Sequence, residues 1–174
     1  MQVPIVMTVI GQDRPGLVEL VASIVAKHEG NWLESRMCRL GGEFAGILRI
    51  HVDSEKETAL LEELETLEAQ GLNVVACSER KVHETRFGRL ATLELVGQDR
   101  PGIVREISRV LASQGVNVEE LTTECSSAPM SGEELFRAKA RLQLPESCAL
   151  ADLRQELERI AGNLVVDVVI AELR

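Results

Sequence analysis

One hexapeptide, Gly-Gln-Asp-Arg-Pro-Gly, occurs twice in this chain, at residues 11–16 and again at residues 97–102. The repetition extends beyond the hexapeptide, because residues 9–32 align with residues 95–118 when the 174-residue sequence is shifted by 86 positions. Two copies with so long a period are typical of two domains of one kind and not of a solenoid. Both halves of the chain must therefore adopt the same fold.

The ends of the repeat predict the domain boundaries. We expect one domain at residues 1–80, a linker at residues 81–88 and a second domain at residues 89–174. Later in each copy the alignment shift grows to 92, so the second copy has about six additional residues. They fall in the polar segment 126–134, whose Pro and Gly indicate a loop.

Each copy shows the same succession of apolar patterns. Short β-branched runs indicate strands, and apolar residues at helical spacing indicate amphipathic helices. In the first copy we expect a strand at 4–10, a helix from 15 to 30, a hairpin turning at 41–42 with a second arm at 44–52, a helix with a capping box at Ser54 and Glu57 that ends at Gly71, and a strand at 72–78.

This βαββαβ order predicts the α+β, ferredoxin-like fold, in which an antiparallel four-stranded sheet carries both helices on one face. The opposite face of each sheet is then uncovered. Two such domains can join edge to edge or through these faces, and the sequence pattern leaves both arrangements open. Uncovered sheet edges and small cores also favour a homodimer.

Each hexapeptide joins the first strand of its copy to the first helix. Pro15 and Pro101 suit the first helical turn, where a missing N–H costs nothing. Asp13 and Asp99 precede the positive end of the helix, where a carboxylate is favoured by about 0.3–1 kcal/mol. A well-capped turn therefore explains the proline, the aspartate and one glycine, but not readily a second glycine, which disfavours a helix.

Free N–H groups at a helix start can hold an anion, so we expect an amino acid at each loop, with its carboxylate on these N–H groups and its ammonium toward the aspartate or the carbonyl groups of the loop. Asn31 and Asn117 begin the next strand and could reach a neighbouring domain's loop across a seam. The candidate ligand-binding residues are Gly11, Gln12, Asp13, Arg14, Pro15, Gly16, Leu17 and Asn31, and Gly97, Gln98, Asp99, Arg100, Pro101, Gly102, Ile103 and Asn117. The alternative is that the loops are only helix caps and the asparagines only turn residues.

Composition argues against a nucleic-acid surface. The chain has a net charge of −9, and aromatic residues make up 2% of it. Nucleic-acid sites are normally basic and rich in stacking aromatics. RNA-binding domains with the same element order display aromatics on a central strand, where this chain has residues 46–52 and 140–144.

Catalytic motifs are also missing from the sequence. It contains no P-loop, no His-Glu-x-x-His and no Ser-His-Asp or Cys-His set that this fold would bring together, so we expect no enzyme. The four cysteines and three histidines are scattered, which predicts neither metal nor cofactor, and cysteines that are reduced and buried. The N-terminus does not have the pattern of a signal peptide, so the expected location is the cytoplasm.

On these residues the chain resembles the ACT domain, a βαββαβ regulatory module that commonly binds amino acids at domain interfaces. The resemblance covers nearly the whole chain as two copies of G-x-D-R-P-G, each followed by Asn about fifteen residues later. Residues 31–50 are in addition similar to the glycine cleavage system transcriptional repressors, a family with two ACT domains. This resemblance implies a glycine-responsive regulator that acts through a protein partner, a DNA-binding transcription regulator. A regulatory subunit of an amino-acid metabolic enzyme and a ligand-free interaction module stay open as alternatives.

Overall fold

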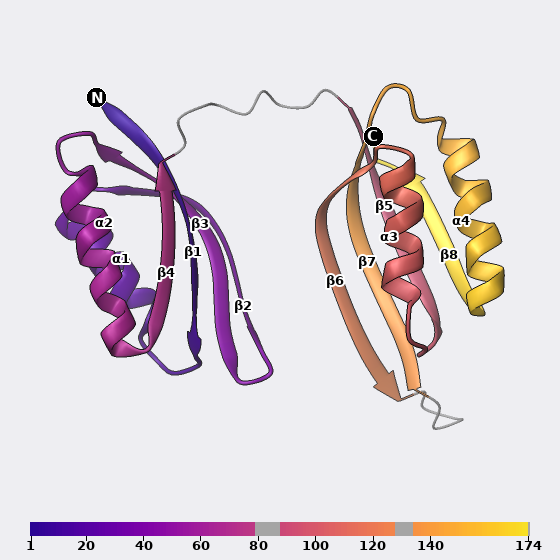
Figure 1. The fold of residues 1–174 in the computed structure, drawn as a ribbon, viewed down its shortest axis with the longest axis horizontal. Helices are drawn as coiled ribbons and strands as arrows, with labels where there is room; N and C mark the ends of the chain where they lie inside the picture. The colour runs from indigo at the N-terminus through magenta and orange to yellow at the C-terminus, as the bar shows by residue number, and fades with distance from the viewer. Residues whose placement is uncertain (79–87, 128–133, 174) are drawn as a thin grey trace. The chain divides into compact units, whose positions relative to one another are not determined.

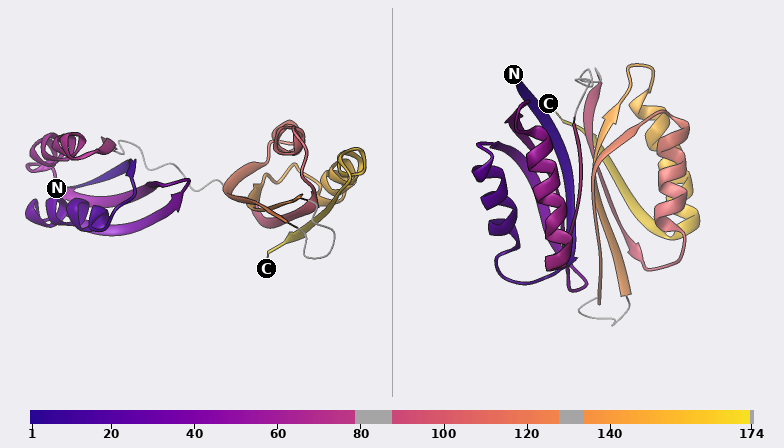
Figure 2. Two further views of the ribbon diagram at one scale, coloured as in Figure 1. Left: turned by 90° about the horizontal axis from the view of Figure 1, so that it is seen from below. Right: turned by 60° about the vertical axis from the view of Figure 1, so that its left-hand side comes forward.

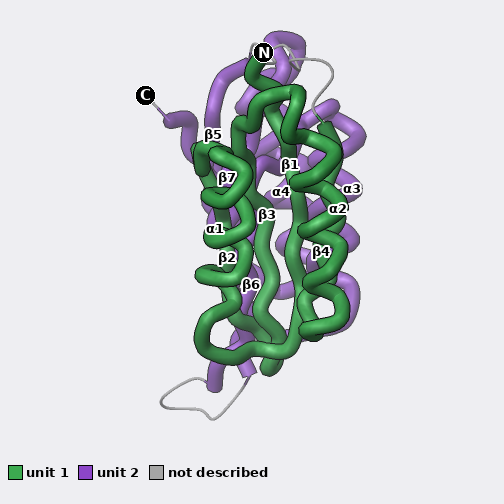
Figure 3. Tube along the Cα trace, turned by 90° about the vertical axis from the view of Figure 1, so that its left-hand side faces the viewer, with its two compact units in different colours: residues 1–84 green, residues 85–174 purple. Residues whose placement is uncertain are grey.

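The computed structural model describes residues 1–78, 88–127 and 134–173. The chain divides into two compact units, residues 1–84 and 85–174 (Figure 3). Each unit has its own hydrophobic core. The linker that we predict at residues 81–88 lies outside the described residues except for Gly88, so the exact limits of the two domains stay a prediction.

Unit 1 folds in the predicted βαββαβ order. Its elements are β1 (Gln2–Gln12), α1 (Leu17–Lys27), β2 (Asn31–Leu40), β3 (Glu43–Asp53), α2 (Glu57–Glu65), the 3-10 helix η1 (Thr66–Gln70) and β4 (Leu72–Ser78). The strands form one antiparallel sheet in the order β2-β3-β1-β4, with α1 and α2 on the same face (Figure 1). The edges of this sheet are therefore β2 and β4.

Unit 2 repeats this architecture. Its elements are β5 (Arg89–Gln98), α3 (Ile103–Ser113), β6 (Asn117–Ser127), β7 (Glu134–Leu144), α4 (Leu150–Leu164) and β8 (Val166–Glu172). The sheet order is β6-β7-β5-β8, and Figure 2 shows α3 and α4 on one face of it. The ferredoxin-like fold is confirmed in both units. Most of the loop predicted at 126–134 lies outside the described residues.

The period of each pattern places the cores between sheet and helices. Alternate residues of the central strands and every third or fourth residue of the helices are buried, which in unit 1 gives Ile5, Met7, Val9, Leu17, Val21, Ile24, Val25, Leu48, Ile50 and Val52. Within its own unit, each sheet leaves its other face uncovered, and Val75 and Val169 are 67% and 63% exposed there. Among the described residues, no helix is both long and apolar enough to cross a membrane.

The predicted capping box is wrong. Helix α2 begins at Glu57 after Lys56, and no side chain caps it. Instead of reaching back to Ser54, the Glu57 carboxylate accepts a hydrogen bond from the hydroxyl group of Ser78 on β4. A partner distant in sequence therefore replaces the local contact that the spacing suggested.

The expectation that the cysteines are buried is confirmed for Cys148 and wrong for the other three. Cys38, Cys77 and Cys125 are exposed. Cys38 and Cys125 lie on the edge strands β2 and β6, where neighbouring strands cover one side only, and Cys77 lies on the uncovered face of β4.

Candidate functional site

The first glycine of each hexapeptide stays inside its strand. Gly11 pairs with Phe44 on one side and with Leu72 on the other, and Gly97 likewise pairs with Phe136 and Val166. A Cβ at Gly11 would overlap the carbonyl oxygen of Gly71, and one at Gly97 would overlap the Val166 side chain. These glycines are needed for the close approach of the neighbouring strand.

The second glycine of each hexapeptide is the residue just before the helix. Gly16 and Gly102 adopt φ values of 95° and 96°, in the left-handed region that disfavours side chains. The helices begin one residue later, so Pro15 and Pro101 lie before the first helical turn and not within it. The second glycine thus has a conformational reason that the sequence pattern did not reveal.

In unit 1 the loop is tied to three neighbouring segments. The Asp13 amide donates a hydrogen bond to the carbonyl oxygen of Gly42 in the β2–β3 hairpin, at 3.0 Å. The Asp13 carboxylate lies 2.7 Å from Nε of Arg39 on β2. Arg14 donates a hydrogen bond of 2.9 Å to the carbonyl oxygen of Gln70. These contacts hold the loop in place while most of its residues stay exposed.

An open hollow lies beside this loop. Its wall consists of the loop itself, the first turn of α1 and one aromatic residue of β3, namely Asp13, Arg14, Gly16, Leu17, Val18, Glu19 and Phe44. The structure therefore brings four of the predicted residues together around one space. The sequence analysis did not identify Val18, Glu19, Phe44 or the ion-pair partner Arg39. Arg39 and Phe44 lie on the β2–β3 hairpin and come close to the loop only through the register of the strands.

In unit 2 the same backbone arrangement carries different side-chain contacts. The Asp99 amide donates to the carbonyl oxygen of Glu134 at 2.9 Å, as Asp13 does to Gly42. Arg100, however, donates to the Gln98 side chain at 2.8 Å. Loss of hydration raises the pKa of the Cys125 thiol, and the carboxylates of Asp99 and Glu134 raise it further.

The register explains this difference between the units. Arg39 pairs with Phe44 in unit 1, and Cys125 pairs with the equivalent Phe136 in unit 2. The residue beside the loop aspartate is therefore a cation in unit 1 and a neutral thiol in unit 2.

The asparagines do not join the loops of their own units. Asn31 begins β2 and pairs with His51, which pairs with Pro4 near the start of β1. The loop follows the other end of β1, so a sheet's full length separates the two groups. Asn117 occupies the same position in unit 2. Within one unit, the predicted site residues form a loop cluster and a distant, exposed asparagine.

Metal binding has no visible basis in the part of the chain that the structure describes. No three His, Cys, Asp or Glu side chains lie close enough there to hold an ion.

Relatives exist for both the whole chain and its parts. The chain is 22% identical over 162 residues to the glycine cleavage system transcriptional repressor of Escherichia coli, covering 92% of this chain and 85% of the relative. It is 33% identical over 81 residues to a UPF0237 protein of Methanopyrus kandleri, covering 46% of this chain and 83% of that protein. The crystal structure of an unknown protein from Galdieria sulphuraria matches the full length of both chains, with a TM-score of 0.88 and 29% identity.

Family models agree with this arrangement of elements. Models of the ACT domain match residues 4–76 and residues 88–168, which together cover most of the sequence. Each match begins at the first strand of a unit and extends into its last strand. The chain therefore belongs to the ACT-domain family, of which it carries two domains in tandem.

Proposed function

We propose that this chain is an amino-acid-responsive regulator without enzymatic activity, which controls transcription through a protein partner. The observation that carries the proposal is the pair of ACT-domain loops, each with a carboxylate beside a helix start. The first N–H groups of a helix have no acceptor within it, so they suit the carboxylate of an amino acid. The ammonium group of the ligand then faces Asp13 or Asp99.

The two loops differ in what a ligand must displace. Arg39 already neutralises Asp13, so an ammonium group in unit 1 competes with a guanidinium group at 2.7 Å. Among the described residues, Asp99 takes part in no ion pair. We therefore expect the loop of unit 2 to bind an amino acid more tightly than the loop of unit 1.

A second chain completes the site in this proposal. Antiparallel pairing of an edge strand with its counterpart in a second chain would place the start of one strand beside the end of the other. The amide of Asn31 or Asn117 would then reach the partner's loop. A ligand held by both chains favours their pairing by its differential affinity for the paired state, which would change the surface offered to the regulated protein.

Glycine is the first ligand to test, because the Escherichia coli relative is a repressor of the glycine cleavage system. The partner in this proposal is a DNA-binding transcription regulator in the cytoplasm. The alternative partner is an enzyme of amino-acid metabolism. A pull-down would distinguish the two, because it would recover either a DNA-binding protein or an enzyme.

A ligand-free interaction module is the second candidate function. The φ values of Gly16 and Gly102 give these glycines a role that requires no ligand. Thermal unfolding with single amino acids separates the two candidates, because ligand at 100 times its Kd adds about 2.7 kcal/mol to the stability of the folded state. A flat response to every amino acid would favour the module.

Substitution assigns the site. Asp99→Asn should abolish most of the thermal shift and Asp13→Asn a smaller part, because the amide no longer attracts an ammonium group. Asp152→Asn on α4 is the matched control, since it removes an exposed carboxylate at another helix start. If Asp99→Asn and Asp13→Asn together leave the shift intact, the loops are not the site.

A further inference from the structure

The edge of unit 1 at β4 offers main-chain groups and an apolar hollow side by side. Among the described residues β4 pairs with β1 only, so the N–H and C=O groups on its outer side face no neighbouring strand. An open hollow of about 210 Å³, here called the β4 hollow, lies between this edge and α2. Its lining consists of Leu61, Leu64, Glu65, Val74, Val75 and Ala76. An extended peptide that joins a sheet edge uses both kinds of surface.

The equivalent edge of unit 2 is closed by an arginine. The first buried residue of α2, Leu60, corresponds to the first buried residue of α4, Leu153. The residues that follow them, Leu61 and Arg154, therefore occupy equivalent positions. Arg154 donates a hydrogen bond of 3.0 Å to the carbonyl oxygen of Ile170 on β8. A main-chain acceptor that already binds a guanidinium group is not available to an added strand.

The carbonyl oxygen that is bound in unit 2 has a counterpart in unit 1. Ile170 pairs with Leu93, and Ala76 pairs with Met7, which lies 86 positions before Leu93. Ala76 is therefore equivalent to Ile170, and its carbonyl oxygen faces the outer side of the sheet in the same way. Leu61 has no group that could donate a hydrogen bond to it. The exchange of arginine for leucine thus opens the β4 edge to a strand.

The charge beside this edge indicates which strand would bind. Residues 57–70, which form α2 and η1, contain five glutamates and no lysine or arginine. Glu63 is paired with Lys27, but Glu65 at the β4 hollow is exposed and forms no ion pair among the described residues. Pairing of two β4 edges would bring two such acidic segments together, and opposed like charges are destabilising. A basic segment fits this edge better than a second copy of the chain.

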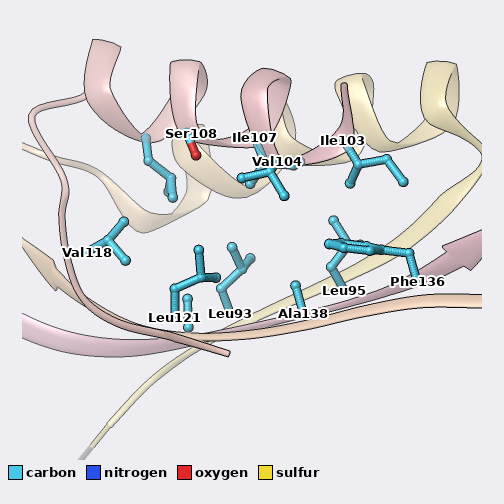
Figure 4. Close-up of a pocket in the computed structure, with 12 residues that line it drawn as sticks. Leu93, Leu95, Ile103, Val104, Ile107, Ser108, Val118, Leu121, Phe136 and Ala138 are labelled. Carbon is cyan, nitrogen blue, oxygen red and sulfur yellow. The ribbon is translucent and has the colours of Figure 1, made fainter. Parts of the chain in front are cut away.

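A different edge is left for a second chain. In unit 2 the opposite edge strand, β6, borders an apolar groove between α3 and the sheet (Figure 4). Val118 and Leu121 of β6 line this groove and are 39% and 50% exposed. This edge and β2 in unit 1 are those at which the proposed function places a second chain. Since β4 lies at the other side of its sheet, a chain paired at β2 leaves it open.

We propose that the β4 edge of unit 1 binds an extended, basic segment of a protein partner as an additional strand. The main-chain groups of Val74 and Ala76 form hydrogen bonds with this segment. An apolar side chain of the segment fills the β4 hollow against Leu61, and a lysine or arginine near it pairs with Glu65. The inference rests on the proposed function for the existence of a protein partner, and it requires no amino-acid ligand.

Fluorescence anisotropy of the full chain with a labelled peptide, Thr-Lys-Thr-Leu-Thr-Lys-Thr, tests the proposal. The leucine and both lysines share one face of the extended peptide, because side chains alternate along a strand. One peptide should bind per chain. Replacement of both lysines by glutamate should weaken binding at least about tenfold, since two attractions become repulsions. N-methylation of the leucine amide removes a main-chain donor and should weaken binding by a similar factor.

Four substitutions test the location. Leu61→Arg gives unit 1 the arginine that closes unit 2, so it should weaken peptide binding at least about tenfold. Ala59→Arg is the matched control, because it adds the same charge to an exposed position of α2 that does not line the β4 hollow, and it should leave binding nearly unchanged. Glu65→Lys should reduce the preference for the lysine peptide over the glutamate peptide. Arg154→Leu should open the β8 edge and raise the number of bound peptides from one to two.

The peptides decide whether a strand is added. If the lysine peptide does not bind, or if the glutamate or N-methylated peptide binds equally well, the proposal is overturned. The proposed function is then decided separately, by the titration with amino acids and by the pull-down.

The variants decide where the strand is added. Peptide binding that survives Leu61→Arg overturns the location, and a single bound peptide in Arg154→Leu overturns the role of the arginine. If Trp32 fluorescence shows that Leu61→Arg unfolds unit 1, the exposed Glu65→Lys decides, and an unchanged preference between the peptides overturns the site. If Leu61→Arg changes the oligomeric state in sedimentation, the edge is an interface between copies and the proposal is overturned.

Discussion

Replacement of Gly16 tests whether the hexapeptide glycines are required by the backbone. No heavy atom lies within 4 Å of the position that a Cβ would take, so the cost of Gly16→Ala is not steric overlap with neighbours. The φ of 95° is left-handed, and this conformation costs an L-residue about 1–2 kcal/mol. Gly16→Asn should lose less, because asparagine enters this region more readily than alanine.

Trp32 gives an assay for unit 1 alone. It is the only tryptophan of the chain, and its side chain packs against the core of unit 1. With a urea dependence of about 1 kcal/mol per M for a small domain, Gly16→Ala should lower the midpoint of the Trp32 fluorescence transition by about 1–2 M. Gly102→Ala is the matched variant, because it places the same strain in unit 2. The resulting loss of stability of unit 2 should appear in an unfolding transition followed by far-UV circular dichroism.

A small loss of stability in Gly16→Ala would contradict this expectation. If Gly16→Ala lowers the free energy of unfolding by less than about 0.3 kcal/mol, the left-handed conformation is not a constraint, since the expected strain is several times larger. If Gly16→Asn lowers the free energy of unfolding as much as Gly16→Ala does, the loss of stability does not arise from the left-handed φ of this residue.

Three further predictions concern single contacts. Lys27 and His28 lower the pKa of Glu63, so the stabilisation is complete above the ordinary value of 4.5 and is lost as the pH falls through the lowered pKa. Glu63→Gln should therefore reduce the melting temperature at pH 7, and the difference from the unsubstituted chain should shrink as the pH falls through the lowered pKa. Leu48→Ala should cost about 2.7–5 kcal/mol in the Trp32 transition, because Leu48 is 1% exposed, and a cost below about 1 kcal/mol would mean that the core collapses around the gap. Asp99→Asn should accelerate alkylation of Cys125 at pH 8, measured by mass spectrometry, because it removes a carboxylate that raises the thiol pKa; an unchanged rate would contradict their proximity.

The fold was predictable because its signals are local and occur twice. Two-residue alternation in β3 and three-to-four-residue spacing in α1 each identify one buried face, and the glycines at 41–42 identify the hairpin between β2 and β3. The ends of elements were less predictable. The strand predicted at 4–10 extends to Gln2–Gln12, because β3 pairs with it along its whole length. The capping box failed for a similar reason, since Ser78 binds Glu57 from another strand.

The candidate site was predictable only where it consists of consecutive residues. Asp13 and its loop follow from the hexapeptide. Arg39, however, lies 26 positions after Asp13 in the sequence, and it comes close to Asp13 only through the register of β2 with β3. A signal was nevertheless present in the sequence, because Arg39 and Cys125 are equivalent positions that differ between the copies.

Under the proposed function, these differences between the copies would change how the two loops bind their ligand. If the loops bind an amino acid as proposed, two identical loops would bind one ligand twice, whereas the cation beside Asp13 and the thiol beside Asp99 would give the loops unequal affinity for an ammonium group. If both loops act on one conformational equilibrium, the tighter site responds first and the weaker site extends the response to higher concentration. Arg39→Cys would make the loops alike in charge and should bring their affinities for glycine together, as two-site calorimetry would measure. Affinities that stay apart would show that the aspartate's neighbour does not set them.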